Sequence, residues 1–204
     1  GFPSRWEKGD KKKVYCIDPE FIIFGPEKQE RGGFSIKLTN DGDEMIIWLN
    51  GAFGAGKTQT AFELQRGLKN SYVYDPENVG FFIRDNIPPS LSVPDFQDYP
   101  VWRRFNFEML EYISQQYGGT VIVPMTVTNR AYYDEIIGKL SEKHDVKHII
   151  LYAERETLLK RLASRFEGPS SWGAQQIDRC IRAFDEDITE YKIHTDSINI
   201  YQTV

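Results

Sequence analysis

The sequence predicts a three-layer α/β protein in which helices cover both faces of a sheet of about five mostly parallel strands. From Met45 onward, short β-prone runs alternate with helical stretches, a pattern typical of right-handed crossover connections. A glycine-rich segment lies between the first such strand and the first helix. The length of 204 residues, 40% of them hydrophobic, is enough for one domain with a sizeable core.

The first strand and the segment after it indicate a nucleotide site. Residues 45–49 are apolar and β-prone, and GAFGAGKT at 51–58 fits the phosphate-binding pattern G-x-x-x-x-G-K-[ST], the P-loop, in its strand-to-helix context. Backbone N–H groups of such a loop bind phosphate oxygens, Lys57 reaches the β- and γ-phosphates, and the Thr58 hydroxyl ligates Mg²⁺. We therefore expect ATP and Mg²⁺ as cofactors. The predicted cofactor-binding residues are Gly51, Ala52, Phe53, Gly54, Ala55, Gly56, Lys57, Thr58 and Gln59.

The remaining elements follow in order along the chain. Helices are predicted at 60–68, 100–116, 131–143, 156–165 and 174–190, and further strands at 71–74, 120–125, 147–153 and 197–201. The helix at 100–116 carries Trp102, Phe105, Met109 and Ile113 on one stripe at helical spacing. The Gly/Pro/Ser-rich loop at 168–173 has the composition of a mobile lid.

The composition divides the chain into two parts. Residues 1–44 form a predicted N-terminal extension, with a lysine run at 11–13, a Pro/Gly/Glu-rich stretch at 25–33 and two short β-prone runs at 21–24 and 34–38. Residues 45–204 form the predicted P-loop kinase-like domain.

Charge and cysteine content indicate which partners and which cellular compartment suit the protein. The net charge of −5 argues against a nucleic-acid partner, since such proteins usually present a basic face. Cys16 and Cys180 are too few for a disulfide framework, and no apolar run approaches the roughly 20 residues of a membrane span. We expect a cytoplasmic protein, with peripheral attachment to a membrane left open.

Missing motifs narrow the class of P-loop protein. A guanine-specific GTPase normally carries Asn-Lys-x-Asp after a late strand, and the chain has no such tetrapeptide. A motor of the AAA type needs a strand that ends in Asp-Glu, whereas the strand at 120–125 is followed by Thr126. The size and layout that remain are those of a small-molecule kinase.

Asp75 is the predicted catalytic base. It follows the strand at 71–74 and lies beside the P-loop if the strands pair in parallel. There it is able to accept a proton from a substrate hydroxyl or to help hold Mg²⁺ through water. The alternative role is a helix cap, since Asp-Pro-Glu is a good helix start, and the two roles are compatible.

Two sets of further residues point to anionic and aromatic ligands. Arg161 and Arg165 stand four apart beside the lid, where paired arginines clamp a transferring phosphoryl group; the alternative is a solvated charged face. Arg103 lies in the first turn of a helix, where a cation opposes the helix dipole, which hints at an anionic ligand unless nearby acids compensate. The predicted substrate residues are Arg84, Trp102 and Arg103.

Several of these stretches resemble the TmrB-type tunicamycin-resistance proteins. The resemblance runs from Met45 almost to the C-terminus, leaves the first 44 residues unmatched, and includes the unusual contexts GAFGAGKTQT and DP-x-x-x-G. The matching stretches are 45–65, 71–85, 120–128, 156–169 and 170–181. The resemblance implies a nucleoside-monophosphate-kinase-like fold with a lid, ATP binding, and resistance to tunicamycin, a nucleoside antibiotic that bears sugars and a fatty acyl chain.

The resemblance also assigns roles to matched positions. Residues 51–58 would hold the phosphates and Mg²⁺, Asp75 matches the acidic position that serves as base in related kinases, and Arg161 and Arg165 match the lid arginines. We expect phosphoryl transfer from ATP to a hydroxyl of tunicamycin or a similar nucleoside-type antibiotic. Two alternatives stay open: ATP-dependent sequestration of the drug without chemistry, and a housekeeping kinase of a small molecule.

Overall fold

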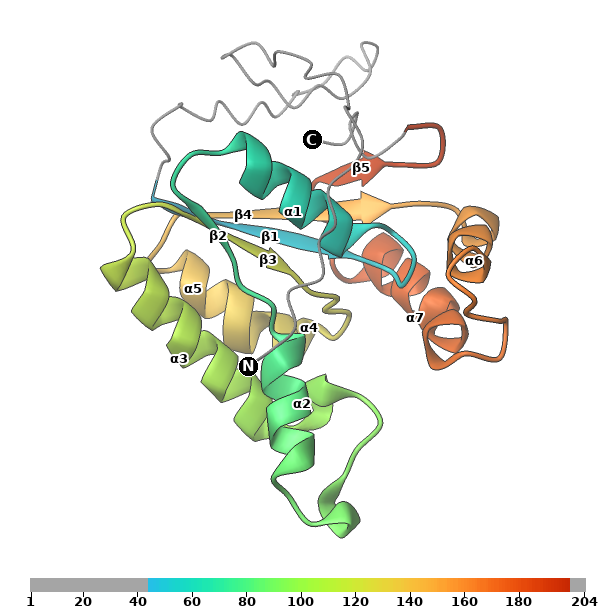
Figure 1. Cartoon of the computed structure of the whole chain (residues 1–204), viewed down its shortest axis with the longest axis horizontal. Coiled ribbons are helices and arrows are strands. Elements are labelled where there is room, and N and C mark those ends of the chain that lie inside the picture. Colours follow the sequence, from blue (N-terminus) through green and yellow to red (C-terminus); the bar gives the residue numbers. More distant parts are fainter. Residues whose placement is uncertain (1–43, 199–204) are drawn as a thin grey trace, which may run out of the picture.

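The computed structural model describes residues 44–198 and contains one five-stranded sheet (Figure 1). The strands are β1 (Met45–Gly51), β2 (Ser71–Val73), β3 (Thr120–Pro124), β4 (Val146–Tyr152) and β5 (Lys192–His194). They lie in the order β2-β3-β1-β4-β5, and every pair is parallel. This arrangement confirms the predicted α/β class.

The helices cover both faces of this sheet. The longer ones are α1 (Lys57–Gly67), α2 (Glu77–Asp85), α3 (Pro100–Gln116), α6 (Arg155–Ala163) and α7 (Trp172–Glu186). The shorter ones are η1 (Pro89–Leu91), η2 (Phe96–Asp98), α4 (Arg130–Tyr133), the π-helical turn η3 (Asp134–Gly138) and α5 (Lys139–Ser141). Helix α1 covers one face, α3 to α5 cover the other, and α6 and α7 lie at the carboxyl ends of the strands (Figure 1).

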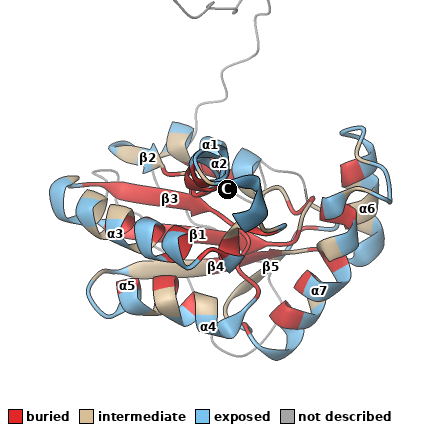
Figure 2. Cartoon of the chain, turned by 90° about the horizontal axis from the view of Figure 1, so that it is seen from below, coloured by how far each residue is buried: buried red, intermediate tan, exposed pale blue. Residues whose placement is uncertain are grey.

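The two central strands are buried along their whole length because helices cover them on both sides. All residues of β1 and β3 are buried, and Figure 2 shows them as the middle of the core. Such strands carry near-continuous apolar sequence rather than alternation. Trp48 is fully buried in β1, and its indole Nε1 donates to the carbonyl oxygen of Met125 at 3.0 Å.

Helix α3 turns most of the predicted stripe to the core, since Trp102 is buried and Met109 and Ile113 pack against the core. The predicted stripe included Phe105, but the Phe105 side chain is exposed, and the buried residues are Trp102, Arg103, Asn106 and Leu110. Asn106 belongs in the core because its Oδ1 accepts from the Tyr74 hydroxyl at 2.8 Å and its Nδ2 donates to the carbonyl of Trp102 at 2.8 Å. An apolar pattern cannot identify a polar side chain whose bonding capacity is satisfied inside the protein.

The fifth strand was predicted in the wrong place. The strand beside β4 is Lys192–His194, and Ser197 and Ile198 follow it outside any strand. The rest of the predicted run at 197–201 lies outside the described residues, as do residues 1–43 of the predicted extension. None of the helices in the described part of the chain combines the length and apolar character that a membrane span needs.

Candidate functional site

The P-loop joins the carboxyl end of β1 to the first turn of α1. Gly51, Gly54 and Gly56 have φ angles of 145°, 86° and 96°, a region in which L side chains are strained. A Cβ on Gly51 would lie 2.5 Å from the carbonyl oxygen of Leu151, and one on Gly54 would lie 2.9 Å from that of Leu158. The loop therefore needs glycine both for its turn and for its close packing on β4 and α6.

Lys57 begins α1, and its ammonium group lies inside this loop. Its Nζ donates to the carbonyl oxygens of Gly51 at 3.0 Å and Ala52 at 3.1 Å. It also lies 5.5 Å from the centroid of the Phe53 ring. Burial lowers the pKa of Lys57 to about 8, against the attraction of nearby carboxylates. An anionic phosphate in the loop would restore the preference for the charged form.

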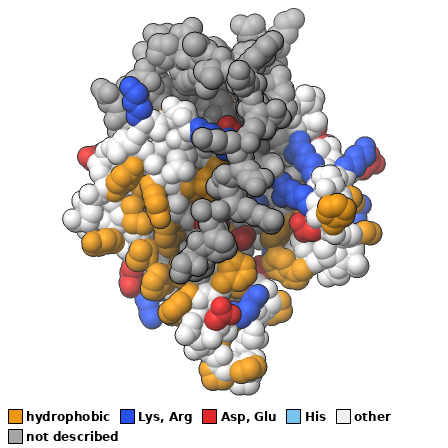
Figure 3. Space-filling view, in the orientation of Figure 1, with side chains coloured by type: hydrophobic (Ala, Val, Ile, Leu, Met, Phe, Trp, Pro, Cys, Tyr) orange, Lys and Arg blue, Asp and Glu red, His pale blue; other side chains and the backbone are white. Residues whose placement is uncertain are grey.

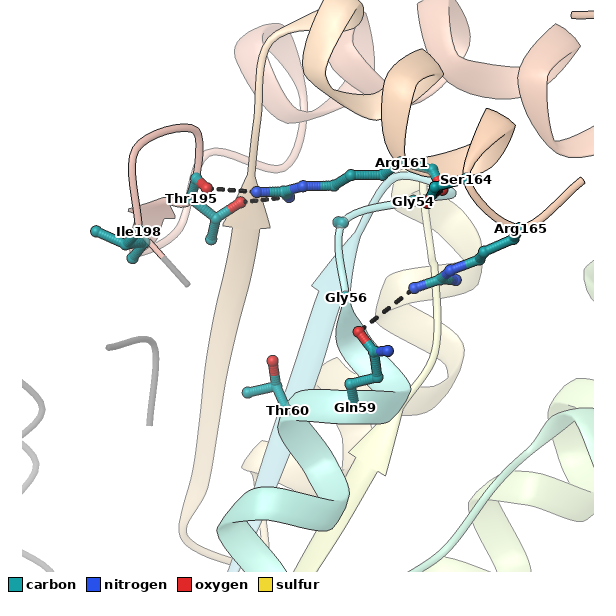
Figure 4. A pocket seen from close by; sticks show the side chains of 10 residues that line it. Gly54, Gly56, Gln59, Thr60, Arg161, Ser164, Arg165, Thr195 and Ile198 are labelled. Atoms are coloured by element: carbon teal, nitrogen blue, oxygen red, sulfur yellow. Dashed lines mark hydrogen bonds between the residues drawn. The ribbon is translucent and has the colours of Figure 1, made fainter. Parts of the chain in front are cut away.

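A first cavity, the P-loop pocket, has a volume of about 340 Å³ (Figure 4). Its lining residues are Gly54, Ala55, Gly56, Gln59, Thr60, Arg161, Ser164, Arg165, Thr195 and Ile198. They come from the loop, from α1, from α6 and the turn after it, and from the segment after β5. Basic side chains gather over α6 on the face seen in Figure 3. The pocket thus joins backbone N–H donors to arginines, a combination that suits anions.

The two predicted lid arginines meet at this pocket but are held differently. Arg161 donates from Nη1 to the Thr195 hydroxyl at 3.0 Å and from Nη2 to the carbonyl oxygen of Thr195, so both ends of its fork are placed. Arg165 has a single 3.5 Å contact from Nη2 to the Gln59 side-chain oxygen. Helix α6 ends at Ala163, so Arg165 lies in the following turn and not in the helix as predicted. Arg165 is the freer cation of the two.

A second cavity, the aromatic pocket, has a volume of about 460 Å³. Its lining residues are Phe53, Glu77, Phe81, Arg84, Pro94, Asp95, Phe96, Gln97, Met125, Glu167, Trp172 and Gly173. Phe53 and Trp172 meet edge to face with centroids 5.0 Å apart, and Phe81 and Phe96 do so at 5.1 Å. Because Phe53 lines this pocket and residues 54–56 line the other, the P-loop borders both cavities.

Asp75 and Glu77 lie where β2 passes into α2. The predicted parallel pairing is present, but β3 stands between β2 and β1 in the sheet. Oδ1 of Asp75 accepts from the backbone N–H of Glu77 at 3.0 Å, so Asp75 binds the first residue of α2, although the N-cap residue of that helix is Pro76. Both carboxylates interact electrostatically with Lys57. Glu77 is exposed, but protein atoms around its carboxylate displace part of its hydration, and this loss, and then the charge of Asp75, raise the pKa of Glu77.

Comparison with known proteins decides the family. No protein-family model and no curated protein sequence matches the chain. Among solved structures it is similar to the tunicamycin resistance protein of Deinococcus radiodurans, with 30% identity, a TM-score of 0.66, and coverage of 78% of this chain and 90% of that one. The chain belongs to the tunicamycin-resistance family.

More distant solved structures define the fold of this family member. A sugar kinase from Janibacter sp. has a TM-score of 0.54 at 18% identity, covering 78% of this chain and 89% of that one. A gluconokinase from Sinorhizobium meliloti has a TM-score of 0.53 at 14% identity, covering 81% and 88%. The chain therefore has the P-loop kinase fold.

The three predicted substrate residues of this family member fall in different places. Arg84 lines the aromatic pocket, with its guanidinium carbon 4.2 Å from the Phe96 ring centroid. Trp102 is fully buried, and its Nε1 donates to the carbonyl oxygen of Pro76 at 3.0 Å. This hydrogen bond holds the start of α2, so the Trp102 indole is not available to bind a ligand.

Arg103 also has a supporting role. Its Nε lies 2.7 Å from Oε2 of Glu135, Nη1 donates to the carbonyl oxygen of Gln97, and its guanidinium carbon stacks 4.0 Å from the Tyr132 ring centroid. The alternative to an anionic ligand was compensation by nearby acids, and Asp95 and Asp98 are close in the sequence. The acid is Glu135, which is 32 residues away and invisible to a local argument.

Glu77 is a functional candidate that the sequence pattern did not predict. It stands two residues after Asp75 in Asp-Pro-Glu, where it indicated only a helix start. Its position in the first turn of α2, one turn from an aromatic run, could have indicated a pocket-facing side chain.

The residues present suit Mg²⁺ held largely by phosphate and water. Thr58 lies exposed in the first turn of α1, next to Lys57. In the described residues no group of three or more His, Cys, Asp or Glu side chains could hold a metal by itself. Mg²⁺ usually keeps several waters and binds through one or two protein groups plus substrate phosphates, so the Thr58 hydroxyl and a water-linked Asp75 fit it.

Proposed function

We propose that this protein binds Mg·ATP at the P-loop and transfers the γ-phosphoryl group to a hydroxyl of tunicamycin or a similar nucleoside-type antibiotic. The observation that carries the proposal is that one loop borders two pockets, one built for anions and one lined by aromatic rings. Phosphoryl transfer needs the two reactants in line and held together, so catalysis is mainly positioning and charge stabilisation.

The P-loop side would hold the donor. Backbone N–H groups of the loop after Gly51 and the N-terminus of α1 would bind the β- and γ-phosphates, with Lys57 beside them. Mg²⁺, when bound, neutralises charge on the phosphates. Arg165, the less constrained lid cation, would approach the transferring group, while Arg161 is held by Thr195 at the far wall of the pocket.

The charges of the aromatic pocket favour an uncharged acceptor. Glu77 and Glu167 line it, and the third acid, Asp95, is paired with Arg179 at 2.9 Å. Arg84 already packs over Phe96 and lies 3.4 Å from the carbonyl oxygens of Val93 and Pro94. A second phosphate would meet carboxylates there. A nucleoside-type compound with a planar base and hydroxyl groups suits the rings and acids better.

The carboxylates Asp75 and Glu77 would supply the base. In the transfer, the acceptor hydroxyl oxygen forms a bond to the γ-phosphorus as the bond to the ADP oxygen breaks, and the hydroxyl proton passes to a carboxylate. Glu77 lines the aromatic pocket, and its raised pKa makes it a stronger base. Asp75 would hold Mg²⁺ through water with the oxygen that does not cap α2.

The test is a product assay. Protein, Mg·ATP and tunicamycin are incubated together, and the mass of the recovered drug is measured by mass spectrometry. We expect a product heavier by one phosphoryl group, formed at equal rate with ADP, and none with Lys57→Ala. Drug that is recovered unmodified after long incubation would refute the transfer.

The same assay separates the two alternatives. Sequestration predicts ATP-dependent binding of the drug without product, and resistance that survives Glu77→Gln and Asp75→Asn but not Lys57→Ala. A housekeeping kinase predicts turnover of an ordinary nucleoside at a much higher kcat/KM than that of tunicamycin.

A further inference from the structure

Asn50, the residue before the P-loop, fixes the start of that loop. It is fully buried, and its Oδ1 accepts from the backbone N–H groups of Gly51 and Val127, each at 2.9 Å. Its Nδ2 donates to the carbonyl oxygen of Val127 at 2.9 Å. The carbonyl of Gly51 is held in turn by the Thr126 hydroxyl at 2.8 Å and by Lys57 Nζ. The side chain of Asn50 therefore ties the first peptide of the loop to the segment after β3.

The second N–H of the Asn50 side-chain amide donates a hydrogen bond to His148 on β4. Because two backbone N–H groups already identify Oδ1 as the acceptor, Nδ2 must be the donor in its 3.0 Å contact with His148 Nε2. Nε2 is therefore unprotonated, and the neutral imidazole carries its proton on Nδ1. Burial, and then the charge of Arg130, lower the pKa of His148 to about 4, so this neutral form prevails at physiological pH.

The groups around His148 come from elements distant from the P-loop. The Tyr133 ring of α4 packs edge to face on the imidazole at 5.1 Å. Nδ1 faces Oε2 of Glu190, 3.7 Å away in the turn between α7 and β5, and Arg130 lies 3.6 Å from the other oxygen of that carboxylate. The His148 side chain is only 5% exposed.

We infer that His148 is a positioning residue that holds the first turn of the phosphate loop through Asn50, with the Tyr133 ring packed against its imidazole. The inference rests on the proposed nucleotide binding for its effect on affinity, but not for its effect on the loop itself. The competing view is that His148 only fills space in the core. The two views differ in what happens when the ring is replaced by side chains of different reach.

The test compares His148→Gln with His148→Asn. Both variants put an amide in place of the ring, but only the glutamine amide reaches the position of Nε2. Ile136→Val serves as the matched control, since it removes one buried methyl group in η3 with no link to Asn50. Amide hydrogen exchange at Gly51 and Val127 is measured in the ligand-free protein, and the Kd of a fluorescent ATP analogue is measured by titration.

We expect His148→Asn to speed exchange at both amides and to weaken the analogue about tenfold, the scale of one unmade buried hydrogen bond. His148→Gln should restore both values to within about twofold of the starting protein, and Ile136→Val should change neither. Equal exchange in the Gln and Asn variants would overturn the inference. If the starting protein does not bind the analogue, the proposed function fails, while the exchange rates still decide the role of His148.

Discussion

At the scale of single residues, the site depends on charged groups whose ionisation the surrounding fold alters. Lys57 is buried among the carbonyl groups of its own loop, so its ammonium group is less favoured than in water. Loss of hydration, and then the neighbouring carboxylate of Asp75, raise the pKa of Glu77, so its ionised form is less favoured too. The P-loop motif predicts Lys57, but no motif predicts Glu77, because the aromatic pocket that Glu77 lines is built from residues that come together only in the folded chain.

The pKa of Lys57 predicts how nucleotide affinity depends on pH. Binding of phosphate favours the protonated amine, so affinity should be nearly constant below about pH 8 and fall above it as the amine loses its proton. The fall should approach tenfold per pH unit until the pKa in the complex is reached. Titration of an ATP analogue from pH 6.5 to 10 measures this. Lys57→Met should bind weakly with no such fall, and an identical profile in that variant would contradict the assignment.

The raised pKa of Glu77 predicts that the rate of turnover falls at low pH, which gives the pH–rate profile an acid limb. A base must be ionised to act, so kcat/KM for the acceptor should drop as pH falls through the raised pKa of Glu77. Asp75→Asn should move this limb to lower pH, because the negative charge of Asp75 raises that pKa. Glu77→Gln should abolish the limb and lower kcat by about 100-fold or more. If Asp75→Asn removes the limb and Glu77→Gln does not, Asp75 is the base, as the sequence suggested.

At the scale of elements, the turn between α6 and α7 carries two aromatic side chains with different surroundings. Trp172 begins α7, lines the aromatic pocket and contacts Phe53 of the P-loop. Phe166 lies six residues earlier and is fully exposed. The pair offers a comparison in which residue type and location in the turn are similar and only the contact differs.

We expect Trp172→Ala to weaken acceptor binding and Phe166→Ala to leave it unchanged. Loss of an aromatic contact and of pocket wall should cost about 1 kcal/mol or more, which corresponds to a Kd for tunicamycin raised by at least about fivefold. Nucleotide affinity should change by less than about twofold in both variants, since Arg161 and the loop backbone are untouched. Calorimetric titration of each ligand measures both. A similar loss in the Phe166 variant would mean that the turn acts as a whole.

At the scale of the whole molecule, the sheet explains which predictions succeeded. Local features placed β1, the P-loop and α1, because each is specified by neighbouring residues. Residues with distant partners could not be placed: Arg103 pairs with Glu135, Asn106 binds Tyr74, and Asn50 reaches His148 98 residues away. The order of the strands in the sheet could not be predicted from the sequence either, so β3 was not expected between the strand that precedes Asp75 and the strand that precedes the P-loop.

The central place of the P-loop predicts that nucleotide should stabilise the entire fold. The loop packs on β4 through Gly51 and on α6 through Gly54, and Asn50 ties it to the segment after β3. A ligand that binds only the folded chain at 100 times its Kd adds about 2.7 kcal/mol to the free energy of unfolding. For a domain of this size that is a rise in Tm of roughly 5–11 °C. Thermal unfolding with and without Mg·ATP measures it.

The control for this rise is Lys57→Ala, whose Tm should stay nearly constant with nucleotide because the binding energy is lost. Arg165→Ala should keep most of the rise, since its one contact to the loop region is the long one to Gln59. This pattern would separate residues that hold the nucleotide in the ground state from those that act on the transferring group, because only ground-state binding raises Tm. A full rise in the Lys57 variant would place the stabilising nucleotide somewhere other than the P-loop.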